Sequence, residues 1–474
     1  MIASVIFCLS AVSQNENDAF RYSFMKPGGT ARFTSMGGAF GALGGDFSTL
    51  STNPAGLAVF RGSEITFTPS LDYSSVESTY YGSMMDDMKY NFNFNNLGLV
   101  FVIPISGPID QPGWKSVNFG LGINRHNNFN QRWIAEGFNT ESSIMTDLLD
   151  KAIGQGTVEN LDDFSTGLAW DTWLLYRDNF GQFAVDMPNG RVLQRQETNS
   201  SGSIREFVFS AGANYNDFVF LGLTVGLPTV SYNENSVFVE TDRDNLNSVF
   251  NSLTFTNKFS TSGTGFNLKA GIIVRATDMV RLGASIHTPT FFKLNDEYSA
   301  SMRSSLNLSE YTDFASSPNG WFSYQLNTPL KATGSLGLVF GNAGLVSFDY
   351  EYVDYTRMRL RSDSYGFSSE NSIIRENFTA QHNLRLGGEL RFDPLVLRAG
   401  YAFYSSPYRE GVNDGQQSVI SAGIGIRERH FFMDFAYAHT FFSEDYFLYN
   451  ARFVNPVENQ YSLSRFLLTL GFRF

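Results

Sequence analysis

The chain has 474 residues, of which 15% are aromatic and only 17% are charged, whereas about a quarter of the residues are charged in a typical soluble protein. Its formal charge of -12 at pH 7 argues against a nucleic-acid partner, and no apolar run approaches the roughly 20 residues that a membrane-spanning helix needs. No linker divides the chain, so we expect one large unit rather than the three or so soluble domains that its length suggests. Aromatic, weakly charged and with a mean hydropathy of -0.16, the sequence is typical of a membrane β-barrel, whose alternating strands average out on a hydropathy scale.

The first residues, MIASVIFCLSAVSQ, contain an apolar core from Ile2 to Val12 and the small-residue site Ala11-Val12-Ser13. This pattern predicts a signal peptide over residues 1–13, and therefore an exported protein. A buried strand is the alternative interpretation. Cleavage after Ser13 would remove Cys8, the single cysteine, so we expect no thiol chemistry in the mature protein.

Residues 14–62 form a glycine-rich segment that has the pattern of neither a strand nor a long helix. It contains GGDFSTLSTNPAGLA, in which the tetrapeptide Asn53-Pro54-Ala55-Gly56 stands just before the first convincing strand. Asn-Pro favours a turn, glycine allows another backbone to approach closely, and the Asn53 amide offers donors and an acceptor. An ordinary turn leading into the first strand is the alternative interpretation.

From residue 63 onward, apolar and polar residues alternate with the period of a β-strand. In the last segment one face carries Phe466, Leu468, Leu470, Phe472 and Phe474, and the other carries Arg465, Thr469, Gly471 and Arg473. The segments GFNLKAGIIVR and HNLRLGGELRF repeat this pattern, with Lys269 and Arg385 on their polar faces. One face suits lipid, and the other suits a polar lumen.

The cost of burying charge in lipid decides which face points inward. A basic residue on the lipid face near the midplane costs roughly 2 to 4 kcal/mol. Turning Lys269, Arg385 and Arg398 outward would therefore cost on the order of 10 kcal/mol in total. We expect all three cations to face the lumen.

The alternating segments number fourteen, which is an even number as in bacterial outer-membrane barrels. They begin near Ser63, Phe94, Ser116, Ile204, Asp217, Gly263, Met279, Thr328, Gly344, Gln381, Pro394, Ser418, His430 and Tyr461. Tight turns, such as Tyr215-Asn216, alternate with long loops, of which we expect the longest at residues 127–203, 229–262 and 291–327. A soluble β-sandwich is the alternative fold, but its connections would not sort by length in this way.

The sequence resembles the family of outer-membrane hydrophobic-compound transporters typified by the long-chain fatty acid transporter FadL and including TodX. The resemblance is carried by MGGAFGALGGDFSTLSTNPAGLA, RLGASIHTPTFFKL, LNTPLKATGSLGLVFGNAGLVSFDYEYVDYTRMRL and HNLRLGGELRFDPLVLRAGYAFYSSPY. It implies an all-β fold, a 14-stranded antiparallel transmembrane barrel over residues 63–474, in the outer membrane of a Gram-negative-type bacterium. It also implies that residues 14–62 fold into the lumen as a hatch, in which Asn53, Pro54, Ala55 and Gly56 would take part in gating.

The resemblance further implies a monomeric channel for passive uptake of hydrophobic molecules such as long-chain fatty acids. Loops would capture the ligand, the lumen would bind it, and it would leave past the hatch or sideways through the wall. The expected partners are this small molecule and outer-membrane lipid. A structural or secretion-associated barrel that binds a protein partner without transport is the alternative function.

Four inward cations are candidate ligand-binding groups for a carboxylate in the lumen: Lys269, Lys331, Arg385 and Arg398. Burial of a tail of roughly sixteen carbons supplies on the order of 10 kcal/mol at about 0.8 kcal/mol per methylene, so a cation would orient the ligand more than hold it. Asp349, Glu351 and Glu389 occupy neighbouring inward positions. A ladder of ion pairs along the wall is therefore the alternative role for these cations.

Two loop segments predict amphipathic helices that could capture an apolar ligand. Their apolar faces would contain Ile144, Leu148, Leu149 and Ile153 in the first, and Leu246, Val249, Phe250 and Leu253 in the second. We take Leu148, Leu149, Val249 and Phe250 as capture candidates, with packing between the loops as the alternative. The longest loop follows the third strand, whereas in the family it lies between the fifth and sixth, so the capture groove does not transfer residue by residue.

Nothing in the sequence indicates catalysis. The five histidines, His126, His287, His382, His430 and His439, are scattered, and no nucleophile elbow or metal-spaced cluster is present. We therefore expect no enzyme activity, no metal and no cofactor.

Overall fold

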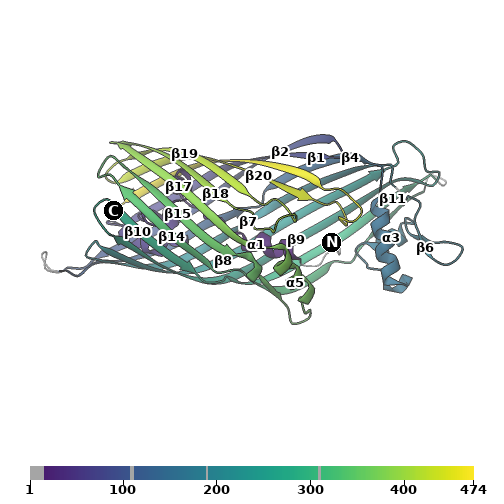
Figure 1. Cartoon of the computed structure of the whole chain (residues 1–474), viewed down its shortest axis with the longest axis horizontal. Helices are drawn as coiled ribbons and strands as arrows, with labels where there is room; N and C mark the ends of the chain where they lie inside the picture. The colour runs from purple at the N-terminus through teal and green to yellow at the C-terminus, as the bar shows by residue number, and fades with distance from the viewer. Residues whose placement is uncertain (1–14, 107–111, 188–189, 308–310) are drawn as a thin grey trace.

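The computed structural model describes residues 15–106, 112–187, 190–307 and 311–474. Within these residues, fourteen antiparallel strands close into a barrel, because the last strand, β21 (Val457–Arg473), pairs with the first, β1 (Glu64–Tyr80). Figure 1 shows strands tilted along an elongated barrel, with the C-terminus at one end and helix α3 at the other. The predicted fold class is confirmed. The predicted signal peptide, residues 1–13, lies outside the described residues.

The wall is a continuous series of hairpins, in which each strand pairs with the next. After β1 come β2 (Ser83–Pro104), β3 (Trp114–Asn128), β7 (Val192–Tyr215), β8 (Val219–Thr241), β9 (Phe250–Arg275), β10 (Val280–His287) continued by β11 (Phe291–Leu306), β13 (Gly320–Asn327) continued by β14 (Lys331–Val339), β15 (Gly344–Asp354), β17 (Ala380–Phe392), β18 (Leu395–Tyr404), β19 (Gln417–Arg427) and β20 (Phe431–Tyr446). Two of these strands are interrupted at Pro289 and Pro329, because proline cannot donate a ladder hydrogen bond.

The prediction that these cations face the lumen is confirmed. Lys269, Arg385 and Arg398 are only 5%, 2% and 5% exposed, whereas Leu386 and Leu390 on the other face of β17 are 49% and 57% exposed. The outward face of β17 is therefore apolar at these positions, and the three cations lie inside.

The strands run further than the alternation predicted, and the boundaries of the long loops need correction. β8 continues to Thr241 and β9 starts at Phe250, so most of residues 229–262 is strand; β11 likewise occupies much of 291–327. The first predicted loop contains β4 (Gln131–Asn139) and the first half of β7. At this end the outward face is polar too, as at Ser231 and Asn233, so the contrast between faces that identifies membrane strands disappears.

The N-terminal segment lies inside the barrel, and we call residues 15–62 the hatch. It contains helices α1 (Glu16–Ser23) and α2 (Ala31–Ser35) and two 3-10 turns, η1 (Phe47–Ser51) and η2 (Pro54–Val59). α2 packs against β18 to β21, and η2 packs against β7, β8 and β9. Side chains cap each turn: Asp46 accepts from the Ser48 N–H, and Asn53 accepts from the Ala55 N–H. The hatch is therefore a folded plug that contacts the wall on opposite sides.

The end of the barrel farthest from the C-terminus is covered by packed loops (Figure 1). The remaining elements are α3 (Ile144–Gln155), η3 (Val158–Asn160), α4 (Thr166–Asp171), β5 (Tyr176–Arg177), β6 (Phe183–Ala184), β12 (Tyr311–Ser316), η4 (Tyr355–Arg357), β16 (Arg359–Arg361) and α5 (Ser368–Asn377). Among the described residues, no helix is both long and apolar enough to cross a bilayer.

Candidate functional site

A cavity of about 330 Å³, the upper cavity, lies beside α1 under the loops. Ten aromatic side chains from the hatch, the strand extensions and the loops line it: Phe20, Phe24, Phe129, Trp133, Tyr232, Phe378, Tyr408, Phe442, Tyr446 and Tyr461. Polar groups line the rest, including the carboxylates of Glu16, Glu234 and Glu444. Aromatic rings offer large apolar surfaces at little conformational cost. The cavity is therefore suited to an apolar or aromatic guest.

Helix α1 forms one wall of the upper cavity and is fixed there by its aromatic side chains. The Phe20 ring lies 5.2 Å from the rings of Phe24 and Tyr355 and 5.4 Å from that of Phe378. On the opposite side of the helix, the Tyr22 hydroxyl donates to Thr261 Oγ1 of β9 at 2.8 Å. The N-terminal helix therefore forms part of the wall of the upper cavity.

A second cavity of about 230 Å³, the lower cavity, continues from the first toward the hatch. Both are lined by Phe24, Gln417 and Phe442, so the two cavities adjoin each other at the end of α1, and we call them together the path. The lower cavity adds Ala402, Val419 and Ala438 from the wall together with three cations, Lys26, Arg385 and Arg465. The path therefore begins among aromatic rings and ends beside positive charge.

Lys26 is a lumen cation that the sequence interpretation missed. Its ammonium lies between aromatic rings, 5.4 Å from the centroid of Phe24, 5.7 Å from Tyr404 and 5.9 Å from Phe442. Within the described residues it forms no ion pair with a carboxylate, whereas Arg385 is paired with Glu351 at 2.7 Å. Lys26 lies in the hatch and belongs to no strand, so the alternation rule that selected the other cations could not reveal it.

Only one of the four predicted lumen cations lines the path. Arg385 faces the lower cavity, whereas Lys269 pairs with Glu206, and Lys331 donates to the Met25 carbonyl at 2.9 Å. Both lysines line a separate cavity of about 30 Å³, which is room for little more than a water molecule. Arg398 is held between Glu389 and Asp434, at 2.8 Å from each. For Lys269 and Arg398 the contacts favour the ion-pair ladder over ligand binding.

The tetrapeptide at residues 53–56 lies against the wall at the base of the lumen. Asn53 Nδ2 donates to the Gly41 carbonyl at 2.6 Å and to the Ile272 carbonyl of β9 at 3.3 Å. Pro54, Ala55 and Gly56 begin η2 and are buried. Asn53 thus ties two parts of the hatch together and joins them to the wall.

A belt of inward-facing wall glycines lets the hatch backbone approach the barrel. At eleven positions a Cβ atom would stand within about 3.1 Å of a hatch atom: Gly98, Gly120, Gly122, Gly212, Gly222, Gly271, Gly283, Gly337, Gly387, Gly400 and Gly423. At Gly222 the added atom would be 2.1 Å from the Pro54 carbonyl carbon. These glycines lie on strands from β2 round to β19, so the hatch fits the lumen on nearly all sides.

Buried polar groups add to this fit. The N–H groups of Phe40 and Gly41 donate to the Asp349 carboxylate at 3.1 and 3.0 Å, and the Arg32 guanidinium donates to Glu389 at 3.0 Å. On the opposite wall, Asn118 donates to the carbonyls of Leu57 and Phe60. Withdrawing the whole hatch would leave many such groups unpaired, each at a cost of about 1 to 3 kcal/mol.

The barrel wall is interrupted between β2 and β7. β3 pairs with β2 only from Asn96↔Asn124 to Pro104↔Ser116, while β2 continues to Ser83 with β1 as its single ladder partner in the described chain. A wall gap of about 400 Å³ lies there and is lined by Asn91, Asn93, Arg125, Asn130, Gly202, Ser203, Arg205, Thr229, Val230 and Ser231. Asn130 also lines the lower cavity. The gap therefore adjoins the lumen path.

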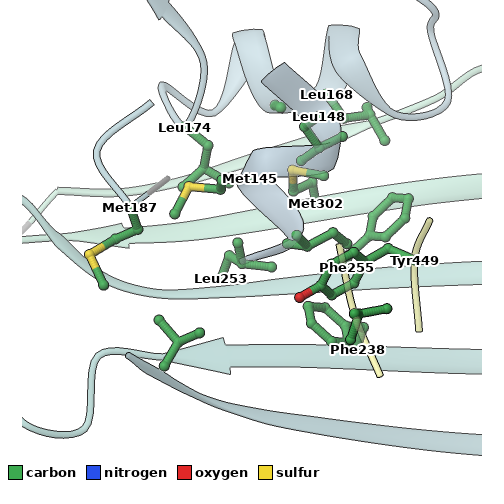
Figure 2. Packing of buried hydrophobic residues seen from close by; sticks show 14 of the residues in the cluster. Met145, Leu148, Leu168, Leu174, Met187, Phe238, Leu253, Phe255, Met302 and Tyr449 are labelled. Carbon is green, nitrogen blue, oxygen red and sulfur yellow. The ribbon is translucent and has the colours of Figure 1, made fainter. Parts of the chain in front are cut away.

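The predicted capture residues are brought together, but in a closed core. The helix predicted at 144–153 is confirmed as α3, whereas the second is wrong: residues 242–249 form a turn and β9 starts at Phe250. Leu148 and Phe250 are 2% and 1% exposed and share one apolar cluster, with Leu149 packed against it. Figure 2 shows Leu148 in this cluster together with Leu253 and Phe255. Val249 is half-buried beside it. Residues 250–255 belong to strand β9, in which Leu253 and Phe255 share one face. A register shift opposite Ser305 and Leu306 brings Phe250 into the same core.

Replacing Leu148 by alanine is expected to loosen this loop core without affecting the barrel. Truncating a buried leucine costs about 2 to 5 kcal/mol, and here the loss falls on the packing of α3 against the strands. Limited proteolysis should cut the α3 region faster in Leu148→Ala than in the parent protein. Ile153→Ala is the matched control, because Ile153 on the same helix is 62% exposed; equal cutting of both variants would contradict the role of Leu148.

The lumen histidines have ordinary polar partners. His126 Nε2 is 3.1 Å from Glu206, and His287 Nε2 is 2.6 Å from the Thr52 carbonyl of the hatch. In the described part of the chain, no group of three or more His, Cys, Asp or Glu residues is placed to hold a metal ion.

No family model and no curated protein match this sequence. Solved structures do: a FadL homologue of Pseudomonas aeruginosa has a TM-score of 0.59 and 15% identity over 95% of this chain and 100% of that one. The P. putida toluene transporter TodX has a TM-score of 0.56 at 12% identity, covering 94% and 99%, and the Ralstonia pickettii toluene transporter TbuX has 0.52 at 14%, covering 94% and 99%. The chain is a 14-stranded outer-membrane β-barrel. Its fold is that of the FadL and TodX transporters, with the N-terminal segment inside as a plug.

Proposed function

We propose that this barrel is a passive channel for hydrophobic small molecules, such as long-chain fatty acids or aromatic hydrocarbons, and that it works as a monomer. The observation that carries the proposal is the pair of adjoining cavities between the loops and the hatch, the upper of which is lined by ten aromatic side chains. The fold supports it, because the similar solved structures are toluene transporters and a FadL homologue.

The path suits a molecule with an apolar body and, optionally, an anionic end. A tail of about sixteen carbons gains on the order of 10 kcal/mol when buried, at about 0.8 kcal/mol per methylene. Lys26 and Arg385 lie at the far end of this path and can orient a carboxylate. Downhill partitioning from the outside supplies the driving force, so the transport step needs no chemical reaction.

The ligand leaves through the wall gap between β2 and β7, while Asn53 and its neighbours keep the hatch seated. The glycine belt and the buried hydrogen bonds of Asp349 and Asn118 make withdrawal of the whole hatch costly. The wall gap lies next to the lower cavity and opens the barrel sideways without moving the hatch. A hydrophobic molecule that leaves this way emerges on the outer face of the barrel beside Arg205 and Thr229.

Filling the wall gap with Asn91→Trp is expected to slow uptake several-fold while the purified protein still retains ligand. The Asn91 Oδ1 atom is buried without a hydrogen-bond partner, so the exchange breaks no bond to that oxygen. Tyr90→Trp is the control, because Tyr90 faces outward on the same strand and is 65% exposed. Unchanged uptake in Asn91→Trp would indicate that the ligand leaves past the hatch and not through the wall gap.

The proposed function is tested by ligand retention and by uptake. Native mass spectrometry with lipid extraction should find a lipid-like molecule bound to the purified protein. Cells that carry the gene should take up radiolabelled oleate or toluene faster than cells from which it is deleted. Equal uptake in the two strains for both compounds, together with an empty barrel, would reject the proposal.

A further inference from the structure

The outer surface of the barrel carries a row of polar residues where the apolar band ends. Directly paired residues on six neighbouring strands form this row, which we call the basic row: Arg205, Thr229, Thr264, Lys293, Gln325 and Arg361. The pairings are successive, Arg205 with Thr229, Thr229 with Thr264, Thr264 with Lys293, Lys293 with Gln325, and Gln325 with Arg361. The row is therefore continuous around this face of the barrel.

The basic row lies at a sharp change of polarity. On four of the six strands, two residues toward the C-terminal end of the barrel, the outward side chains are Phe207, Leu227, Phe266 and Phe291, all at least 39% exposed. On β13 and β16 the same positions hold Asn327 and Arg359. Two residues toward the loops, the outward side chains are Ser231, Ser262, Asn295 and Ser323. Because aromatic and apolar residues face hydrocarbon and polar ones face water, the basic row marks the outer boundary of the membrane on this face.

The three cations of the row have no acidic partners. Arg205, Lys293 and Arg361 are exposed, and none forms an ion pair within the described part of the chain. The nearest outward carboxylate on β11 is Glu297, four residues or about 13 Å along the strand from Lys293. In a chain with a net charge of -12, unpaired cations in one row on the membrane boundary present a local positive field to the outer leaflet.

A groove lies just below the row on the same lipid-facing surface. It has a volume of about 560 Å³ and lies on β7, β8, β9 and β10. Apart from Thr288, its outward lining is apolar and includes the small residues Ala211 and Ala270 and the larger Phe209, Leu223, Leu268 and Ile286. Arg205 stands four residues above Phe209 on β7, and Thr264 stands four residues above Leu268 on β9. A chain in the groove would therefore point its polar end at the basic row.

We propose that the basic row and the groove together bind one phosphorylated glycolipid of the outer leaflet. Its phosphates lie on Arg205 and Lys293, with Arg361 as a third cation, and the hydroxyls of Thr229 and Thr264 face the sugar between them. Arg205 and Lys293 are three strands apart, about 14 Å, which fits two phosphates separated by a disaccharide better than a single phosphate. One acyl chain occupies the groove. Arginine and lysine both bind phosphate as charge-assisted donors.

Native mass spectrometry of the detergent-purified protein tests this site, with bisphosphorylated lipid A as the probe. The triple variant Arg205→Gln, Lys293→Gln, Arg361→Gln is expected to lose lipid A binding by about tenfold or more. The matched control is Lys258→Gln, Arg303→Gln, which removes exposed outward cations beyond the row on β9 and β11. Ala270→Phe, which fills the groove and leaves every cation, is expected to weaken binding as well.

The probes separate the possible occupants. Lipid A without its two phosphates should bind the parent protein and the triple variant equally weakly. Inorganic phosphate should not displace bisphosphorylated lipid A from the parent protein. Equal binding of the two forms of lipid A, equal losses in the triple variant and its control, or a second copy of the chain at the row in place of lipid would overturn the proposal. Uptake through the lumen should be unchanged in the double variant Lys293→Gln, Arg361→Gln, which leaves Arg205 in place at the wall gap.

Discussion

Replacing Ala402 by tryptophan is expected to reduce uptake of hydrophobic molecules to near the level of cells without the protein. Ala402 is 1% exposed and faces the lower cavity from β18, where only about 230 Å³ is open. A tryptophan side chain is the largest that could be placed there, so it fills much of the passage between the upper cavity and the wall gap. We expect uptake to fall by about tenfold or more, because the tryptophan side chain narrows the path itself and does not only weaken one contact with the ligand.

Ala399→Trp is the matched control for this experiment. Ala399 lies three residues earlier on β18 and faces outward, where a tryptophan contacts lipid. Both variants should reach the outer membrane and keep the heat-modifiable mobility of a folded barrel. Uptake of radiolabelled oleate or toluene should fall only in Ala402→Trp. If both variants transport like the parent, the two cavities are not the route.

Replacing Gly222 by valine is expected to unseat the hatch and open the barrel to ions. A Cβ at this position would stand 2.1 Å from the Pro54 carbonyl carbon and 2.4 Å from the Ala55 nitrogen. Both are backbone atoms, so η2 must move as a unit. Overpacking of this kind costs about 1 to 3 kcal/mol, which shifts the seated and unseated populations by up to roughly a hundredfold.

Single-channel recording in planar bilayers measures this change directly. The parent should remain nearly closed to ions, because the hatch fills the lumen, and Gly222→Val should show frequent large openings. Gly334→Val on β14 is the control, because no atom lies within 4 Å of a Cβ added there. Closed recordings from both variants, with faster proteolysis of the hatch in neither, would show that the glycine belt does not hold the hatch in place.

The barrel could be predicted from the sequence because a membrane imposes a simple rule on each strand. Lipid on one side and a polar lumen on the other force apolar and polar residues to alternate, so Lys269 and Arg385 could be placed from their neighbours alone. The rule fails where both faces of a strand contact water. Beyond Val230 on β8 and before Gly263 on β9, the strands continue with polar residues on their outward faces, and these segments were predicted as loops.

The site depended on contacts between residues far apart in the chain. Lys26 stands between rings from the hatch, β18 and β20, and Phe20 packs on Tyr355 and Phe378, more than 300 residues away. No local pattern records such neighbours. The same holds for the predicted lumen cations. Alternation along the strands placed all four inside the barrel. Only the structure shows that Lys269 and Arg398 are engaged in ion pairs with Glu206, Glu389 and Asp434 and so belong to the wall and not to the path.

The sequence by itself determined that this chain forms a barrel, how many strands it has, which faces point inward and that the NPAG segment belongs to no strand. Each of these depends on local spacing and on the cost of placing charge in lipid. Only the tertiary structure decided where the cavities lie, which glycines meet the hatch, where β3 leaves β2, and how Arg205, Lys293 and Arg361 come to share one row. These features depend on strand register around a closed cylinder, and register brings together residues that the sequence keeps apart.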